Sequence, residues 1–148
     1  MSAAGGAQVR RRLTLAALAL IVMAPGVAVA QDPRAIQVQR VARDWLALAD
    51  KLDAAGTWKS AGPRFQDAIS DTRWAALLRR ERETRGALVQ RTVVATSFGS
   101  SFPALPAGGS YALVRFRTSF ASQPNSGEDV TLEQGADSVW RVIGYVIR

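Results

Sequence analysis

The chain has 148 residues, which is room for one domain and little else. It contains neither cysteine nor histidine, which excludes a disulfide framework, a thiolate nucleophile and a Ser-His-Asp triad, and removes the commonest zinc ligand. The 19 basic and 12 acidic residues give a formal charge of +7, but there is no dense run of basic and aromatic residues of the kind that binds nucleic acid.

The first 30 residues have the pattern of a cleavable secretory signal. Arg10–Arg12 form a positive start, Leu13–Ala24 an apolar stretch, Pro25-Gly26 a break, and Ala28–Ala30 the small residues that a signal peptidase recognises. An uncleaved anchor is the alternative, but the break interrupts it, and the apolar stretch is shorter than the about 20 residues that span a bilayer. We expect cleavage after Ala30, one domain over 31–148 without a stable membrane anchor, and a periplasmic or secreted location.

The expected mature chain begins with a helical pattern. Asp32-Pro33 combines an N-cap with a first-turn proline, and apolar residues then recur at three- and four-residue steps, which predicts an amphipathic helix that ends at Gly56. Gly62-Pro63 interrupts the segment that follows. We expect Trp58 and Phe65 to pack against the core from a short helical turn there.

A further helix is predicted to begin at Ser70 or Asp71, either of which can cap it, and to end at Arg85, with Gly86 as its stop.

After Gly86 the apolar period changes to two, which indicates strands. The expected strands are Leu88–Phe98, Ser110–Ala121, Glu128–Gln134 and Ser138–Ile147. The expected connections are Gly99–Gly109, Gln123–Gly127 and Gly135–Asp137. Helices followed by strands with short loops predict an α+β fold, with two or three N-terminal helices on one face of a four-stranded antiparallel sheet.

The alternation also predicts a register. Val130 and Leu132 should share a face with Phe116 and Thr118, so paired residue numbers should have an even sum, and the loop length favours 248. The expected pairs are Thr118 with Val130, Phe116 with Leu132, Arg115 with Glu133, Leu132 with Trp140, and Val130 with Val142. The residues expected between helices and sheet are Trp45, Trp74, Phe116, Phe120, Leu132 and Trp140.

The opposite face of this expected sheet is unusually apolar. It carries Tyr111, Leu113, Ile143, Tyr145 and Ile147, with Arg115, Arg117, Glu133 and Arg141 beside them. An apolar patch with a charged rim is typical of an interaction surface, so we expect a homodimer or an envelope protein partner to dock there. The interaction surface proper is Tyr111, Leu113, Arg115, Arg117, Ile143 and Tyr145. In the alternative, the loop Gly99–Gly109 or the leader-proximal segment covers this face within one chain.

Several segments, in order, resemble the bacterial domain-of-unknown-function 4019 family. They are Trp45-Leu46 with Asp50, Trp58-Lys59-Ser60, Trp74, Gly86–Arg91, Pro103–Pro106, Gly109–Tyr111, Thr118–Phe120, Glu128–Leu132 and Trp140–Arg148. The resemblance covers nearly all of residues 35–148. It implies an exported bacterial protein without an established activity, and it offers no catalytic residues to carry over. The arrangement of helices and sheet is also similar to the cystatin-like and nuclear-transport-factor-2-like folds, an analogy that implies no function.

The remaining acid–base chemistry rests on carboxylates. Asp50 and Asp53, three residues apart on the first helix, can face one direction and bind a cation or move a proton, although an exposed helix end is the commoner role of such a pair. Glu128-Asp129 lacks the further ligands of a calcium loop. We therefore predict no catalytic residue, no metal and no cofactor, and a non-catalytic binding or interaction module. The alternative is a small hydrolase or isomerase that uses a carboxylate in a pocket between helices and sheet.

Overall fold

The computed structural model describes residues 31–148, so the predicted signal at residues 1–30 lies outside the described residues. The elements are α1 Pro33–Asp50, α2 Ala54–Ser60, α3 Pro63–Ala68, α4 Asp71–Arg85, β1 Leu88–Gly99, β2 Tyr111–Phe120, β3 Gln123–Gln134 and β4 Trp140–Ile147. Helices precede an antiparallel sheet, which confirms the α+β prediction. The described part has four helices rather than two or three, because the segment expected to hold one helical turn forms both α2 and α3. None of these helices is long and apolar enough to cross a membrane.

The first helix is shorter than predicted. The side chain of Asp32 caps its start by accepting a hydrogen bond from the backbone N–H of Arg34 at 2.9 Å. The helix ends at Asp50, and Leu52 then takes a positive φ of 58° that reverses the chain. Gly56 is therefore not its stop but a residue of α2, where its N–H donates to the capping side chain of Asp53 at 2.8 Å.

The prediction for α4 is confirmed at both ends. The hydroxyl of Ser70 caps its start, accepting from the N–H of Arg73 at 3.3 Å. Gly86 follows its last turn with a φ of 77°, a conformation that glycine adopts without strain. On its inner face Trp74 is buried and donates its indole N–H to the hydroxyl of the fully buried Thr57 at 2.8 Å.

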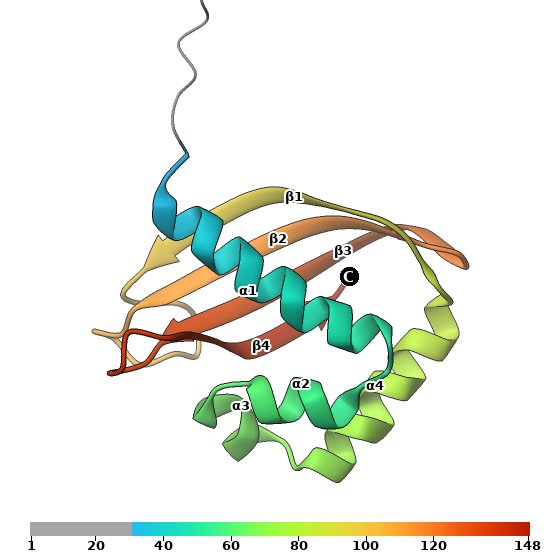
Figure 1. The fold of residues 1–148 in the computed structure, drawn as a ribbon, viewed down its shortest axis with the longest axis horizontal. Coiled ribbons are helices and arrows are strands. Elements are labelled where there is room, and N and C mark those ends of the chain that lie inside the picture. Colours follow the sequence, from blue (N-terminus) through green and yellow to red (C-terminus); the bar gives the residue numbers. More distant parts are fainter. Residues whose placement is uncertain (1–30) are drawn as a thin grey trace, which may run out of the picture. The chain divides into compact units, whose positions relative to one another are not determined.

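The strands form one antiparallel sheet in the order β1-β2-β3-β4. Figure 1 shows α1 lying across one face of this sheet, with β1 at one margin and β4 at the other. The α2–α3 junction contacts the β4 margin at one point, where the N–H of Gly62 donates to the carbonyl of Val142 at 2.8 Å. The outer side of β1 has no backbone hydrogen bond to another described residue.

The predicted register of β2 and β3 has the correct parity but is wrong by four residues. Val114 pairs with Val130 and Phe116 with Glu128, a sum of 244 in place of 248. The cause is the turn: the chain reverses at Ala121 and Ser122, and residues 123–127, predicted as a turn for their Pro124 and Gly127, begin β3. Pro124 is tolerated because it lies where β3 extends past the end of β4, so its missing N–H deprives no neighbouring strand.

The predicted register of β3 and β4 is also wrong. Leu132 pairs with Val142, and after a bulge at Ile143 the pairing shifts so that Val130 lies opposite Tyr145. An extra residue in one strand moves every following side chain to the other face. Tyr145 therefore points toward the helices and not, as predicted, away from them.

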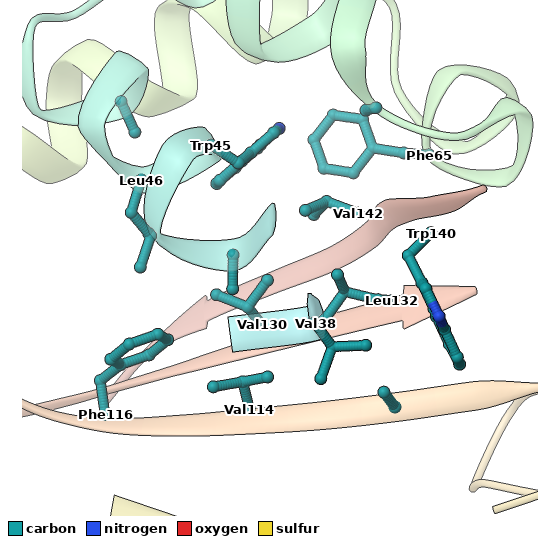
Figure 2. Close-up of a cluster of buried hydrophobic side chains, with 14 of the residues drawn as sticks. Val38, Trp45, Leu46, Phe65, Val114, Phe116, Val130, Leu132, Trp140 and Val142 are labelled. Carbon is teal, nitrogen blue, oxygen red and sulfur yellow. The ribbon is translucent and has the colours of Figure 1, made fainter. Parts of the chain in front are cut away.

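The core lies between the helices and the sheet. All six residues expected there are buried: Trp45, Trp74, Phe116, Phe120, Leu132 and Trp140. Figure 2 shows Trp45 and Leu46 of α1 above Val130 and Val114, with Val38 beside Val130 and Leu132. Phe65 is buried and Trp58 partly buried, as predicted. The rings of Trp45, Phe65, Trp74 and Tyr145 form one cluster, with centroid distances from 5.1 Å to 6.4 Å.

Candidate functional site

The most polar part of the interior is a network of charged side chains under α1 and α4, which we call the buried charge network. Every strand and both long helices contribute to it. Its members are Asp50 of α1, Arg82 of α4, Arg91 of β1, Thr118 of β2, Glu128 of β3 and Tyr145 of β4. Two carboxylates face two guanidinium groups, so the network is electrically neutral.

Glu128 lies at its centre and is fully buried. One carboxylate oxygen accepts from Tyr145 at 2.6 Å, from Arg91 at 3.1 Å and from Arg82 at 3.3 Å. The other accepts from the Nε of Arg91 and from the hydroxyl of Thr118, both at 2.6 Å. These five hydrogen bonds fill the acceptor sites of both oxygens, the condition under which a buried charge is tolerated.

Asp50 closes the network from the end of α1. Its carboxylate accepts from Arg82 at 2.8 Å and from two guanidinium nitrogens of Arg91 at 2.7 Å and 2.9 Å. A carboxylate at a helix C-terminus is unfavourable on its own, because the helix dipole is negative there. Arg82 and Arg91 compensate for the negative charge of Asp50, and Asp50 in turn neutralises part of their positive charge.

The protonation states follow from these contacts. Burial, and then the negative charge of Glu128, raise the pKa of Tyr145 above its ordinary value, so its hydroxyl stays a hydrogen-bond donor. Burial by itself lowers the pKa of Arg91, but the hydrogen bonds and charges of Asp50 and Glu128 outweigh it and raise the pKa above its ordinary value. Tyr145 is therefore held as a hydrogen-bond donor and Arg91 as a cation, and one donor of the network, the Nε of Arg82, is buried without a hydrogen-bond partner among the described residues.

This arrangement bears on the alternative of carboxylate catalysis. Glu128 is the inward-pointing carboxylate that this alternative requires. A general base, however, needs an oxygen within reach of a substrate proton. Both oxygens of Glu128 already accept hydrogen bonds from protein donors. The aromatic cluster packs beside it, and a hollow of about 320 Å³ between α1, α2 and β4, lined by Asp44, Trp45 and Val142 among others, does not reach Glu128. Asp50 and Asp53 do not act as a pair: Asp50 joins the network and Asp53 caps α2. Residues 31–148 hold no cluster of three acidic residues that could bind a metal ion.

The outer face of the sheet is partly covered by the loop that joins β1 to β2. The ring of Tyr111 lies beneath this loop and is buried; its hydroxyl donates to the carbonyl of Pro106 at 2.9 Å. Phe102 packs beside it with ring centroids 6.0 Å apart. A Cβ on Gly109 would collide with the tyrosine ring, so only glycine permits this approach. At Tyr111 the structure agrees with the alternative expected from the sequence, in which the Gly99–Gly109 loop covers this face within one chain.

Beside Tyr111 the loop does not close onto the sheet, and a hollow of about 310 Å³ remains, which we call the outer hollow. It is lined by Phe102, Pro103 and Leu105 of the loop and by Leu113, Asp129, Thr131, Ile143 and Gly144 of the sheet. Its walls are thus mainly apolar with one carboxylate. Asp129 accepts from Arg148 at 2.6 Å and lies 3.6 Å from Arg115.

The structure separates the six residues of the predicted interaction surface. Leu113 and Ile143 line the outer hollow, and Arg115 and Arg117 are exposed beside it. Tyr111 is covered by the loop, and Tyr145 belongs to the buried charge network. The assignment of Tyr145 to this face is wrong because of the bulge at Ile143, which also turns Ile147 toward the face of Glu128.

Sequence reasoning missed Arg82 and Arg91 as partners of the buried carboxylates. Arg82 falls within an exposed-looking run of charges on α4, and nothing local distinguishes it from its neighbours. A weak signal existed at Glu128: the register alternation placed it on the inner face with Val130 and Leu132, where an unpaired carboxylate would be costly. An inward glutamate requires basic partners elsewhere in the chain.

Fold and site together define the class: a small α+β module in which helices cover one face of an antiparallel sheet around a neutral buried charge network, with an apolar hollow on the other face. A family model described as protein of unknown function (DUF4019) matches residues 41–145. The chain belongs to this family, which confirms the resemblance seen in the sequence. No curated protein and no solved structure matches the chain significantly.

Proposed function

We propose that the protein is exported to the bacterial envelope and acts there as a non-catalytic binding module, with the outer hollow as its binding site. The observation that carries this proposal is an apolar hollow on the sheet face opposite the helices, built from Leu113, Ile143 and the loop side chains. Pockets of this kind, mainly apolar with few polar groups, are the usual sites for small ligands and for inserted side chains.

The charged side chains beside the hollow indicate that the ligand carries an acidic group. Arg115, Arg117 and Arg148 lie on or next to the outer face, with Asp129 as the carboxylate among them. Arg117 is exposed and makes no ion pair with a described residue. A ligand with an apolar group for the hollow and an acidic group for Arg117 fits this surface, because guanidinium groups bind carboxylates with two parallel hydrogen bonds.

The test uses an apolar anionic dye, anilinonaphthalene sulfonate, whose fluorescence rises in apolar sites. The native chain should bind it, and Leu113→Glu should abolish binding by placing a charge in the hollow. Leu52→Glu, at an exposed leucine outside the hollow, is the matched control and should bind like the native chain. Equal binding by both variants would place the dye elsewhere and overturn the assignment of the site.

Export is tested separately. The order of basic, apolar and small residues at 10–30 supports cleavage after Ala30. Loss of the three leader arginines would lower the formal charge from +7 to +4. N-terminal sequencing of protein from the periplasmic fraction should begin at Gln31. Intact protein beginning at Met1 in the membrane fraction would contradict export in this form.

A further inference from the structure

A second hollow, which we call the aromatic hollow, lies where β1 ends beside the first turn of α1. Its volume is about 320 Å³, at the lower end of the range for small-molecule sites. The rings of Phe98 and Trp140 form part of its wall and meet edge to face, with centroids 6.0 Å apart. The guanidinium of Arg34 lies 4.7 Å from the centroid of Phe98, and Figure 1 shows the start of α1 beside the end of β1. The aromatic hollow shares no lining residue with the outer hollow.

The indole N–H of Trp140 is an unused hydrogen-bond donor in this wall. The other three tryptophans, Trp45, Trp58 and Trp74, donate their N–H to protein oxygens at 3.0, 2.9 and 2.8 Å. Trp140 is only 6 % exposed, yet its N–H has no acceptor among residues 31–148, and its nitrogen is not one of the enclosed atoms that lack a partner. The small exposed part of this ring borders the aromatic hollow. A buried tryptophan usually pairs its N–H, so this donor is available to a ligand.

Arg34 supplies a second unused donor. Its Nε and Nη2 donate to Asp32 at 3.3 Å and 2.9 Å, whereas its Nη1 has no acceptor among the described residues. The ion pair itself is exposed, with 65 % of the arginine side chain and 42 % of the aspartate side chain in contact with solvent. Water competes for such a pair, so it holds the guanidinium only weakly. Arg34 can therefore bind a further acceptor beside the ring of Phe98.

The other polar side chains of the aromatic hollow favour the same kind of ligand. Ser100 and Ser110 line it, and their hydroxyls can donate to a ligand because they form no side-chain hydrogen bond within residues 31–148. Gln134 offers an acceptor, since its amide nitrogen already donates to the carbonyl of Ser138 at 3.1 Å. No acidic side chain of the described residues lines the hollow. Donors therefore outnumber acceptors, and the charged side chain in the wall is a cation, which together favour a ligand with an anionic acceptor.

We propose that the aromatic hollow is a second binding site, and that it takes a small apolar carboxylate. The carboxylate accepts hydrogen bonds from the guanidinium of Arg34 and the indole N–H of Trp140, and the apolar part of the ligand packs against the rings of Phe98 and Trp140. Hydrogen bonds from guanidinium to carboxylate are charge-assisted and stronger than those between neutral groups. The proposal does not rest on the outer hollow, because the two sites have no residue in common, so either site can fail without the other.

The test follows the four indole N–H signals of the full chain in a proton–nitrogen NMR spectrum, with Trp140→Phe identifying the signal of Trp140. Benzoate is the probe, and benzamide is its uncharged counterpart of the same shape. The Trp140 signal should shift and saturate with benzoate, while benzamide should bind about tenfold more weakly or less well still. No tryptophan lines the outer hollow, so benzoate bound there does not produce this shift. An unchanged Trp140 signal, or equal affinity for the two probes, would overturn the proposal.

Two arginines of α1 provide the matched variants. Arg34→Gln removes the proposed cation but keeps the helix cap, because the cap bond to Asp32 uses the backbone N–H of residue 34. Arg40→Gln removes the same charge from an exposed position of α1 that does not line the aromatic hollow. Benzoate affinity, read from the Trp140 signal, should fall about fivefold or more for Arg34→Gln and stay at the native value for Arg40→Gln. An equal loss in both variants would show general attraction by net charge, and no loss in either would exclude Arg34; each result would overturn the proposed site.

Discussion

Replacing Glu128 by glutamine removes the central charge of the network while keeping the size of the side chain. The native carboxylate accepts five hydrogen bonds from four residues. The amide has one acceptor oxygen, and its NH₂ group must face donors that it cannot bond. The substitution also changes the network from neutral to a net positive charge, because Arg82 and Arg91 then share only Asp50.

The size of the effect follows from burial. Removing one partner of a buried ion pair costs about 3–5 kcal/mol, because the opposite charge is left without compensation. Glu128 is fully buried and the side chains of Arg82 and Arg91 nearly so, so solvent screens little of this cost. A loss of this size is a large part of a typical domain stability of about 5–15 kcal/mol. For a domain of this length it lowers the melting temperature by about 10–25 °C.

Urea unfolding followed by tryptophan fluorescence measures the effect, since Trp45 and Trp74 pack on Tyr145 at the border of the network. The slope of unfolding free energy against urea should stay unchanged while the midpoint falls. Glu133→Gln is the control: its pair with Arg64 is partly exposed, so the midpoint should stay near that of the native chain. A loss of less than about 1 kcal/mol for Glu128→Gln would show that water or rearranged side chains replace the carboxylate, and would refute our account of the network.

Two further substitutions test the core and the protonation of the network. Trp140 is buried against Phe98, so Trp140→Ala should destabilise the fold by about 3–5 kcal/mol, and a variant that melts like the native chain would contradict its placement. Because burial raises the pKa of Tyr145, the native state keeps its phenol proton above pH 10 while the unfolded state loses it. The unfolding free energy should then fall as the pH rises above 10, by up to about 1.4 kcal/mol per pH unit. Tyr145→Phe should reduce this slope, and an identical slope in denaturation curves collected from pH 9 to 11 would contradict the shift.

Local sequence signals were sufficient where local chemistry decides the structure. The caps at Asp32 and Ser70 and the stop at Gly86 are short-range hydrogen-bonding and backbone effects, and all three are where the sequence places them. The alternation of β2 likewise assigned Phe116 and Phe120 to the core. These features need no knowledge of distant parts of the chain.

The errors arise at a misplaced turn and at a bulge. Pro124 and Gly127 favour a turn, but the chain turns earlier, which moves the register of β2 and β3 by four residues. The bulge at Ile143 has one local signal, the neighbouring Gly144, since a glycine inside a strand often marks a bulge. The bulge turns Tyr145 to the inner face. Because a strand has a period of two, one such residue inverts the faces of all that follow. For this reason Tyr145, predicted as part of the docking surface, lies on the inner face of the sheet.

The same kind of irregularity brings β1 into the buried charge network. The bulge at Val94 shifts the pairing of β1 by one residue, so that Arg91 and Val93 share the inner face with Thr96 and Phe98. In an unbroken strand Arg91 would alternate onto the outer face and stay in solvent at the edge of the sheet. Turned inward, it needs the carboxylates of Asp50 and Glu128, and it leaves β1 without exposed charge. The bulge at Val94 is therefore what brings Arg91 into the interior, and the two carboxylates are what allow a charged side chain to lie inward on β1.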